Sequence, residues 1–308
     1  MSLTADTLRA LFNSGDLDLP QPGNGDTAER HLRLYEIGRG YPVSVARLAE
    51  AHTDAVAILR EAGHEPHTGA IYGVWASSST PGILLERSAS ARIVTGSKPF
   101  CSGAGIVDRA LVTVIDDAGQ SRLVDVDARP GPTVTYDTDA WRAWALKQAA
   151  TGLARFDGHS VSRPTLGEMP DWYLRRPGFW YGACGPAACW AGSAAGLVDV
   201  AQRLIDDDPH RRATLGAMRA AQWAMEATLR VAGLDIDDAS GASGHRLALS
   251  LRHTIERFAN DILDRFGQAL GPRPFVSEPE TNQRWADTHL YLRQHHGDRD
   301  LAELGRLQ

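Results

Sequence analysis

The segment VTGSKPFCSGAG at residues 94–105, followed by DRALV at residues 108–112, decides the fold class of the middle of the chain. Gly103 and Gly105 match the first two glycines of a dinucleotide-binding fingerprint, but Asp108 stands where the third glycine belongs. The segment also leads into a β-rich stretch, whereas the fingerprint requires a helix whose N-terminus can hold a pyrophosphate. A Rossmann site is therefore excluded. The chain also has neither a GxxxxGK(S/T) phosphate loop nor the GxSxG elbow of a serine hydrolase.

The β-rich part continues beyond this segment as strands that are separated by turns. Residues 116–119 (DDAG) and the pair Asp157-Gly158 are typical of tight turns. β-Branched and apolar residues predict strands at residues 110–115, 123–126, 133–136 and 153–156. No strand alternates with a long helix, so a parallel, doubly wound sheet is disfavoured. We expect an antiparallel β-barrel or sandwich instead.

Apolar residues recur at helical spacing on both sides of the β-rich part. One stripe belongs to a helix that is expected to end at Gly63, and two more follow after residue 178. The three stripes are Val45, Leu48, His52, Val56 and Leu59; Met218, Ala221, Met225, Leu229 and Ala232; and Leu251, Ile255, Phe258, Ile262 and Phe266. A final helix is expected from about Arg284 to His296.

These patterns predict an α+β fold in three parts. The parts are a shortened N-terminal helical segment at residues 1–66, a central β-domain at residues 67–165, and a C-terminal four-helix-type bundle at residues 166–308. In the third part, residues 183–200 are built mainly from Ala and Gly and include Pro186 and Asp199. We therefore expect a closely packed core helix there rather than a membrane span.

Composition and charge narrow the classes of partner and compartment. Hydrophobic residues make up 43% of the chain and charged residues 23%, which is ordinary for a globular protein and excludes wholesale disorder. The net charge is −6 and no stretch combines arginines with aromatic residues, so nucleic-acid binding is not expected. Three cysteines without a CxxC spacing, and no basic and apolar leader at the N-terminus, predict a cytoplasmic protein without a membrane anchor.

The segment at residues 94–105 resembles a motif of the acyl-CoA dehydrogenase family, G-x-K-x-(W/F)-x-(T/S)-x-G, which also leads into a hydrophobic strand. Trp141, residues 145–152 (ALKQAATG) and residues 155–158 (RFDG) are similar to the W…GM-x-x-T-x-(S/T)…F-x-x-V segment of that family. Two further matches, to its Q-x-x-G-G and R-x-x-R-D motifs, are residues 268–272 (QALGP) and 284–287 (RWAD). Because the motifs occur in the family's order, the chain resembles this flavoprotein family from about Tyr72 onward.

The resemblance implies an FAD whose isoalloxazine ring lies between the β-domain and the C-terminal bundle. Phe100 would pack near the ring, and backbone N–H groups and the Ser102 hydroxyl would face its polar edge, because a flat heterocycle needs an apolar wall and a few fixed donors. The cofactor-binding residues that the resemblance implies are Trp75, Phe100, Cys101, Ser102, Thr151 and Gly271. An alternative stays open, in which Phe100 is a core residue and Ser102 belongs to a turn.

The catalytic base of the family is missing from its usual place. Dehydrogenation of an acyl-CoA removes an α-proton, and the family commonly uses a Glu that shortly follows R-x-x-R-D. Here that place falls on His295 and His296, and residues 185–189 of the first bundle helix, the acid's place in some relatives, contain no acid either. The R-x-x-F-G motif that helps to hold the FAD phosphates is also not found, and residues 208–212 (DPHRR) occupy that stretch.

Three functions therefore stay open. The first, which Lys98 and Thr151 favour, is an FAD-dependent, acyl-CoA dehydrogenase-like oxidoreductase that acts on a CH–CH bond of an acyl thioester or similar substrate and passes electrons to an acceptor. The second is a flavin monooxygenase-like enzyme, supplied by a flavin reductase, with His295 as its catalytic residue, since imidazole suits proton transfer near neutral pH. The third is a non-catalytic member of the fold.

The sequence also predicts an oligomer and no metal site. The Ala- and Gly-rich helix at residues 183–200, together with the habit of the family, predicts a homodimer or homotetramer. His289, His295 and His296 lie near the C-terminus but offer no pair at i, i+4 spacing, so no metal ligand set is expected among them. The remaining partner is a small-molecule substrate, which the resemblance suggests is an acyl-CoA.

Overall fold

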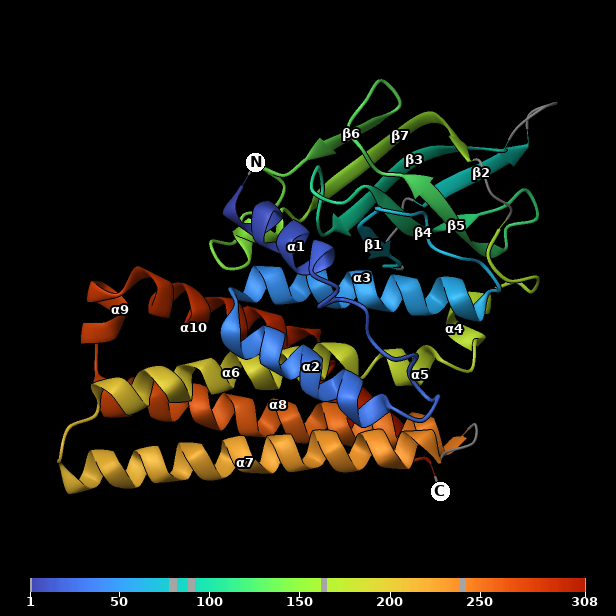
Figure 1. The fold of residues 1–308 in the computed structure, drawn as a ribbon. Coiled ribbons are helices and arrows are strands. Elements are labelled where there is room, and N and C mark those ends of the chain that lie inside the picture. Colours follow the sequence, from blue (N-terminus) through green and yellow to red (C-terminus); the bar gives the residue numbers. More distant parts are fainter. Residues whose placement is uncertain (1, 78–81, 88–91, 162–164, 239–241, 308) are drawn as a thin grey trace. The chain divides into compact units, whose positions relative to one another are not determined.

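The computed structural model describes residues 2–77, 82–87, 92–161, 165–238 and 242–307 (Figure 1). The chain divides into two compact units. Unit 1 comprises Met1–Asp18 and Ala51–Phe179, and unit 2 comprises Leu19–Glu50 and Trp180–Gln308. Each unit is thus built from two separate stretches of chain, and the three-part division expected from the sequence stays a prediction.

Unit 1 contains one mixed sheet of seven strands. The strands are β1 (Tyr72–Trp75), β2 (Ile83–Arg87), β3 (Arg92–Cys101), β4 (Arg109–Ile115), β5 (Ser121–Asp127), β6 (Val134–Asp137) and β7 (Gly152–Val161). Their order is β1-β4-β2-β3-β7-β6, and β5 also pairs with β4. β4 and β5 form the predicted hairpin, in antiparallel register from Arg109 opposite Asp127 to Ile115 opposite Ser121.

The sheet differs from the predicted antiparallel barrel in two respects. β1 and β2 both pair with β4 in parallel. β2 and β4 run in the same direction because the chain reverses twice between them, first between β2 and β3 and again after β3. Among the described strands none joins β6 to β1, so the sheet is open rather than closed. Of the predicted antiparallel barrel or sandwich, the wholly antiparallel pairing is therefore wrong and a closed barrel is not seen among the described strands, while the sandwich stays a prediction.

The turn predicted at Asp157-Gly158 is also wrong, because β7 continues through both residues to Val161. The pairing with β3 shifts here: Val94 lies opposite His159, but Gly96 lies opposite Phe156. Two residues of β7 therefore oppose one residue of β3, which is the definition of a β-bulge. Gly158 has φ +58° and supplies the left-handed conformation that the bulge requires.

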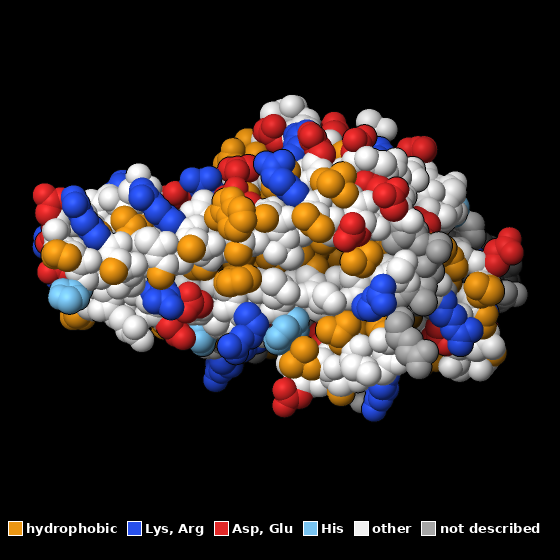
Figure 2. Space-filling view, turned by 90° about the horizontal axis from the view of Figure 1, so that it is seen from below, with side chains coloured by type: hydrophobic (Ala, Val, Ile, Leu, Met, Phe, Trp, Pro, Cys, Tyr) orange, Lys and Arg blue, Asp and Glu red, His pale blue; other side chains and the backbone are white. Residues whose placement is uncertain are grey.

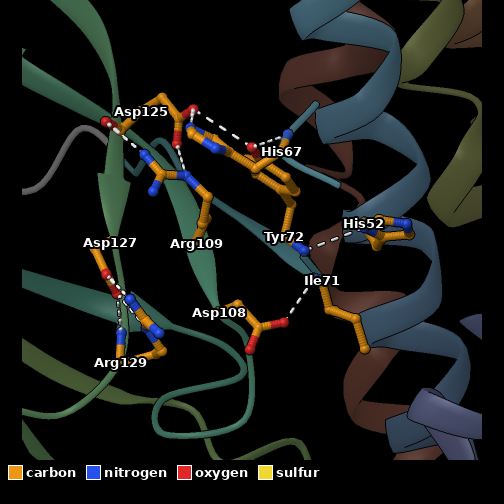
Figure 3. A network of polar contacts seen from close by, with 9 residues as sticks. All are labelled: His52, His67, Ile71, Tyr72, Asp108, Arg109, Asp125, Asp127 and Arg129. Carbon is orange, nitrogen blue, oxygen red and sulfur yellow. Dashed lines mark hydrogen bonds and ion pairs between the residues drawn. The ribbon is translucent and has the colours of Figure 1, made fainter. Parts of the chain in front are cut away.

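A polar network fixes the loop that leads into β4 (Figure 3). Asp108 accepts hydrogen bonds from the Ile71 backbone N–H and from Arg9, both at 2.7 Å. One residue further on, Arg109 donates to the fully buried Asp125 at 2.8 Å. A buried carboxylate is costly unless it is paired, so this contact ties β4 to β5 at one register. The segment after residue 105 thus enters the sheet at a fixed point.

The apolar core of unit 1 lies between this sheet and a helix. The helix is α3 (Val43–Glu61), whose residues from Ala51 onward belong to unit 1. Its Ile58 and Leu59 form one buried cluster with residues of the sheet and its connections, which include Tyr72, Leu111, Leu123 and Leu166. The other helices of unit 1 are α1 (Leu3–Asn13), the one-turn η1 (Lys147–Ala149) and α4 (Trp172–Arg175).

Unit 2 is a helical bundle. Its long helices are α2 (Thr27–Gly40), α6 (Gly185–Leu204), α7 (Pro209–Asp237), α8 (Ala242–Leu270) and α10 (Pro279–Tyr291). α2 packs on α6 and α7, and α8 packs on α6 and α7. All five residues of the predicted stripe on α7 are buried, as are those on α8 except Phe258, which is partly buried. The helical spacing of these residues therefore predicted the faces that form the core.

Short elements complete unit 2 and one of them corrects a prediction. They are α9 (Arg273–Ser277), η2 (Leu292–Gln294) and α11 (Asp298–Leu304), while α5 (Phe179–Gly182) contains residues of both units. The final helix, predicted to reach His296, ends at Tyr291 and is followed by η2. His295 comes next with an extended backbone, at φ −75° and ψ 129°. His295 is therefore displayed by a loop rather than by a helix face.

Small residues let α2 and α6 approach each other closely. A Cβ atom added at Gly192 of α6 would lie 1.9 Å from the Tyr35 carbonyl oxygen of α2, and one at Gly38 would lie 2.6 Å from the Cys189 carbonyl oxygen. The predicted closely packed core helix at residues 183–200 is thus confirmed as α6, most of whose residues are buried. Its small residues are used inside the chain, and the predicted homodimer or homotetramer stays a prediction.

Two observations concern the apolar helices and the charged side chains of the described residues. Among the described residues, no helix combines the length and apolar character needed to cross a membrane. On the face seen in Figure 2, the described arginine and acidic side chains are interspersed with hydrophobic and neutral ones. A basic stripe of the kind that binds nucleic acid is not present among the described side chains of that face.

Candidate functional site

Phe100 near the end of β3 combines backbone strain with exposure. Its φ is +61°, a region that bulky residues rarely adopt, and its side chain is 63% exposed. The pairing of β3 with β7 also shifts between Lys98 and Cys101, so the backbone leaves its regular path here. The alternative that Phe100 is a core residue is therefore wrong. Such strain at an exposed aromatic residue is typical of a ligand-binding position.

Two hydroxyl groups lie together beside this strand end. The Ser102 and Thr151 hydroxyls are hydrogen-bonded at 2.9 Å, and either of them can donate. The Ser102 carbonyl accepts a hydrogen bond from the Trp75 indole N–H, also at 2.9 Å. Gly103 N–H donates to the Ala149 carbonyl at 2.8 Å, which ties this turn to the loop that carries Thr151. The structure thus brings Trp75, Ser102 and Thr151 together, and their contact with a flavin stays a prediction.

The loop that precedes Thr151 carries further strain. Leu146 and Ala150 have φ values of +55° and +46°, although neither is glycine. The Ala150 carbonyl accepts a hydrogen bond from Ala104 N–H at 3.0 Å. Three residues with positive φ, counting Phe100, therefore belong to one pair of connected loops. A backbone held this far from its preferred region needs a rigid surrounding, which suits a preorganised site.

Trp75 and Cys101 lie beneath this surface rather than on it. Trp75 is 2% exposed and packs against the rings of Tyr136 and Phe156. Cys101 is fully buried, and burial raises the pKa of its thiol to about 12, so it is neither a nucleophile nor a surface donor near neutral pH. These two residues hold the backbone of the wall in place, and their predicted direct contact with a flavin stays a prediction.

The residues of unit 1 that the resemblance assigns to a flavin differ in exposure: Phe100 is exposed, Ser102 is partly buried and Thr151 is 6% exposed. A flat heterocycle needs an apolar wall and a few fixed polar groups, and the Phe100 ring and the Ser102–Thr151 hydroxyl pair supply both. Each part is held by contacts within unit 1. We name Phe100, Ser102 and Thr151 the flavin wall.

In unit 2, one ring nitrogen of His295 has a hydrogen-bond partner, and the other has none among the described residues. Its Nδ1 atom accepts a hydrogen bond from Gly297 N–H at 3.2 Å, whereas Nε2 is buried and has no hydrogen-bond partner among the described residues. Burial lowers the pKa of His295, so the ring is neutral near pH 7. Because an acceptor Nδ1 carries no proton, the single proton of the neutral ring is on Nε2. His295 therefore presents an N–H hydrogen-bond donor at Nε2, and its Nδ1 lone pair is engaged by Gly297 N–H.

Arg252 of α8 fixes the backbone next to His295. Its guanidinium donates to the carbonyl of Gln294 at 2.9 Å and to that of Ala183 at 2.7 Å, and it lies 4.8 Å from the Trp190 ring. The side chain is 8% exposed. Arg252 therefore ties the carbonyl of Gln294, the residue that precedes His295, to Ala183 and Trp190 in unit 2.

Two residues near His295 were not predicted from the sequence. His253 and Glu256, one turn apart on α8, bring a ring nitrogen and a carboxylate oxygen within 4.8 Å of a His295 nitrogen and of each other. Their i, i+3 spacing was a signal that could have found them, because it places both side chains on one face of a helix. The other two C-terminal histidines have partners of their own: His289 stacks on Trp285, and His296 pairs with Asp300.

Gly271 is not placed near His295 by the structure. It follows the last residue of α8 with φ +61°, and its N–H donates to the Gly267 carbonyl. Glu256, which lies beside His295, is fifteen residues earlier on the same helix, about 22 Å along its axis. Gly271 therefore has a structural role as the glycine that ends α8, and its predicted contact with a flavin stays a prediction.

The stretch that replaces the phosphate-binding motif is occupied by local contacts. Asp208 caps α7 and accepts a hydrogen bond from Arg211 N–H. The Arg211 and Arg212 guanidiniums pair with Asp206 and Asp207, respectively. These arginines already face carboxylates of their own loop, so the second phosphate and adenosine of FAD have no prepared partner there.

Comparison with known proteins identifies the fold. No family model matches this sequence, and no curated protein matches it either. Among solved structures, the FMN-bound dibenzothiophene monooxygenase TdsC from Paenibacillus sp. A11-2 matches with a TM-score of 0.78 at 16% identity. The alignment covers 98% of this chain and 94% of TdsC.

Two further structures agree with this match. Methanesulfinate monooxygenase MsuC from Pseudomonas fluorescens has a TM-score of 0.72 at 17% identity, over 99% of this chain and 96% of MsuC. KijD3, in complex with FMN and a dTDP-linked amino-keto sugar, has a TM-score of 0.73 at 16% identity, over 93% of this chain and 81% of KijD3. Identities this low show the fold alone: the chain has the acyl-CoA dehydrogenase fold that its ordered motifs predict.

Proposed function

We propose that this chain is a flavin-dependent oxidoreductase of the monooxygenase type, which uses reduced flavin and oxygen to oxidise a small organic substrate. One observation carries the choice between the two enzyme hypotheses, namely the hydrogen bond from Gly297 N–H to Nδ1 of His295. Removal of an α-proton from an acyl thioester requires a base with a free lone pair. The Nδ1 lone pair of His295 is engaged by Gly297, so the ring suits a reaction that needs a hydrogen-bond donor at Nε2.

FMN is the flavin that we propose. TdsC and KijD3 have FMN bound. In this chain the motif that helps to hold the FAD phosphates is not found, and Arg211 and Arg212 are paired with acids of their own loop. Both observations favour a flavin with a single phosphate over the FAD that the resemblance implies.

In the proposed reaction, the flavin and the residues of the chain would have separate roles. A bound reduced flavin supplies the electrons that activate oxygen. Phe100 covers part of one ring face and keeps water from it, while the Ser102 and Thr151 hydroxyls orient the polar edge. His295 would donate a hydrogen bond from its Nε2–H to a group that gains negative charge, and Arg252 keeps its loop in place. Reduced flavin would come from a separate flavin reductase, which is the partner that this function requires.

Oxygen uptake tests this proposal against the dehydrogenase alternative. The protein is loaded with FMN, reduced chemically without oxygen, and mixed with oxygenated buffer and a panel of small aromatic and organosulfur compounds. We expect substrate-dependent oxygen uptake and a hydroxylated or S-oxygenated product. In parallel, the oxidised flavoprotein is mixed anaerobically with acyl-CoAs. Bleaching of the flavin there, without a product in the oxygen experiment, would contradict the proposal and support dehydrogenation.

A further inference from the structure

A cluster on the bundle combines two imidazoles with a carboxylate. α8 supplies His253 and Glu256 from one helical turn, and the loop after η2 supplies His295. One ligand atom from each residue lies within 4.8 Å of the other two. The rings of His253 and His295 are 5.6 Å apart and inclined at 41°, so they do not stack face to face. The three side chains thus converge on a common point.

The cluster contains two buried nitrogens without a protein partner. Neither Nδ1 of His253 nor Nε2 of His295 has a hydrogen-bond partner among the residues that the structure describes. Buried polar atoms in proteins nearly always have one. Two such nitrogens beside the same carboxylate are therefore not explained by packing alone. A cation shared by all three side chains would satisfy both of them.

We propose that His253, Glu256 and His295 bind a divalent transition-metal ion of the Zn²⁺ class. Two imidazole nitrogens and one carboxylate form a ligand set that suits zinc and its first-row neighbours and leaves further coordination positions for water. Mg²⁺ and Ca²⁺ prefer oxygen ligands, so the site discriminates against them. α8 holds two ligands at a fixed spacing, and the Arg252 contact to Gln294 holds the third.

Two existing contacts compete with the metal and set its affinity. Arg293 lies 3.2 Å from the Glu256 carboxylate, and the Asn260 amide donates to the same oxygen. Coordination through Nε2 of His295 also moves the ring proton to Nδ1, which removes the hydrogen bond from Gly297 N–H. Because these contacts are lost on binding, we expect a dissociation constant of about 1 µM rather than the far tighter binding of a structural zinc site.

Metal binding has a consequence for the proposed function. A metal on Nε2 of His295 takes the place of the hydrogen through which this nitrogen would donate a hydrogen bond, so Zn²⁺ would inhibit the proposed reaction. The binding itself does not rest on that function. A chain that binds Zn²⁺ at this cluster but shows no flavin chemistry would support the metal site and refute the oxidoreductase.

Titration of the full chain with metal tests the proposal. The protein is freed of metal with a chelator and titrated with Zn²⁺ in competition with an indicator dye. Co²⁺ serves as a spectroscopic probe because its visible absorption reports the number and type of ligands. We expect one equivalent to bind, and no Mg²⁺ to compete at equal concentration. His253→Ala and Glu256→Gln should each weaken Zn²⁺ binding by about 10- to 100-fold.

Two further variants make the result specific. Arg293→Met removes the competing cation and should tighten Zn²⁺ binding by about tenfold, an increase that a damaged fold would not produce. His289→Ala, which removes a histidine that stacks on Trp285 outside the cluster, should leave the affinity unchanged. The proposal is refuted if the wild-type chain binds no stoichiometric Zn²⁺. It is equally refuted if His253→Ala and Glu256→Gln bind Zn²⁺ as the wild type does.

Discussion

Phe100 has the strained backbone that the flavin wall depends on. A bulky residue at φ +61° costs about 1–3 kcal/mol relative to a relaxed backbone, so its surroundings must hold it there. They do so through the irregular pairing of β3 with β7 and through the Trp75 contact to Ser102. The same irregularity directs the aromatic ring away from the core. Strain and exposure at this residue therefore have one cause.

Phe100→Ala should weaken FMN binding by about tenfold, because it removes the apolar surface against which the ring would lie. The affinity can be measured from the quenching of FMN fluorescence on titration with protein. Trp223→Ala is the matched control, since Trp223 is an aromatic residue 73% exposed on α7. Equal affinities in the two variants would show that the flavin wall lies elsewhere.

His295→Ala should lower the rate of the proposed reaction by about 100-fold, because the loss of one positioned hydrogen-bond donor to a developing negative charge costs about that much. FMN affinity should stay close to that of the wild type, since the flavin wall is built from other residues. The rate is measured as substrate-dependent oxygen uptake and compared with His289→Ala. A normal rate in His295→Ala would remove this residue from the mechanism.

The sequence located some of these residues but not their chemistry. Ser102 and Thr151 followed from ordered motifs, and their hydroxyls do lie together. Whether His295 acts as a base or as a donor depends on the Gly297 N–H, which no spacing in the sequence reveals. His253 was missed because its partner His295 lies 42 residues further along the chain.

At the scale of elements, the approach of α2 to α6 is the most demanding contact in unit 2. Gly192→Ala would place a Cβ 1.9 Å from a backbone oxygen of α2, so the two helices would have to separate. We expect a loss of about 3 kcal/mol in the free energy of unfolding, as for an overpacked core. Gly216→Ala on α7, where a Cβ meets nothing within 4 Å, should instead stabilise the chain by about 1 kcal/mol. Urea unfolding of both variants measures the difference, and equal stabilities would contradict this packing.

Elements were predicted well where the signal is local. The stripes on α7 and α8 follow from helical spacing, and the β4–β5 hairpin follows from two strands and a short turn. The errors involve pairing at a distance. Asp157-Gly158 suits a turn and a bulge equally, and the parallel pairing of β1 with β4 joins segments more than thirty residues apart. Periodicity contains no information about which strands become neighbours.

At the scale of the whole molecule, each unit is assembled from two stretches of chain. Unit 2 takes residues 19–50 from the N-terminal part and joins them to the C-terminal helices. α2 thereby belongs to the bundle, where His31 is 1% exposed and contacts the Leu229 carbonyl of α7. A division made along the sequence assigns this helix to an N-terminal part, because membership in the bundle depends on packing rather than on chain order.

The stability of the molecule should fall in mild acid because of His31. Burial lowers its pKa to about 4 from 6.5, so between these values the unfolded chain binds a proton that the folded chain does not. The stability that the molecule gains by keeping His31 neutral is fully present above pH 6.5 and is lost as the pH falls towards 4. At pH 5 the loss should be about 2 kcal/mol relative to pH 7. Urea unfolding at both pH values, for the wild type and for His31→Asn, checks this: the variant should lose less stability, and equal losses would contradict the assignment.

The most direct test of the central claim is the visible absorption spectrum of the purified chain after excess FMN has been added and the unbound flavin removed. The account predicts a retained flavin spectrum at about one FMN per chain, with FAD retained less well. A colourless protein that takes up neither flavin would contradict the claim and leave a chain that keeps the fold without its cofactor.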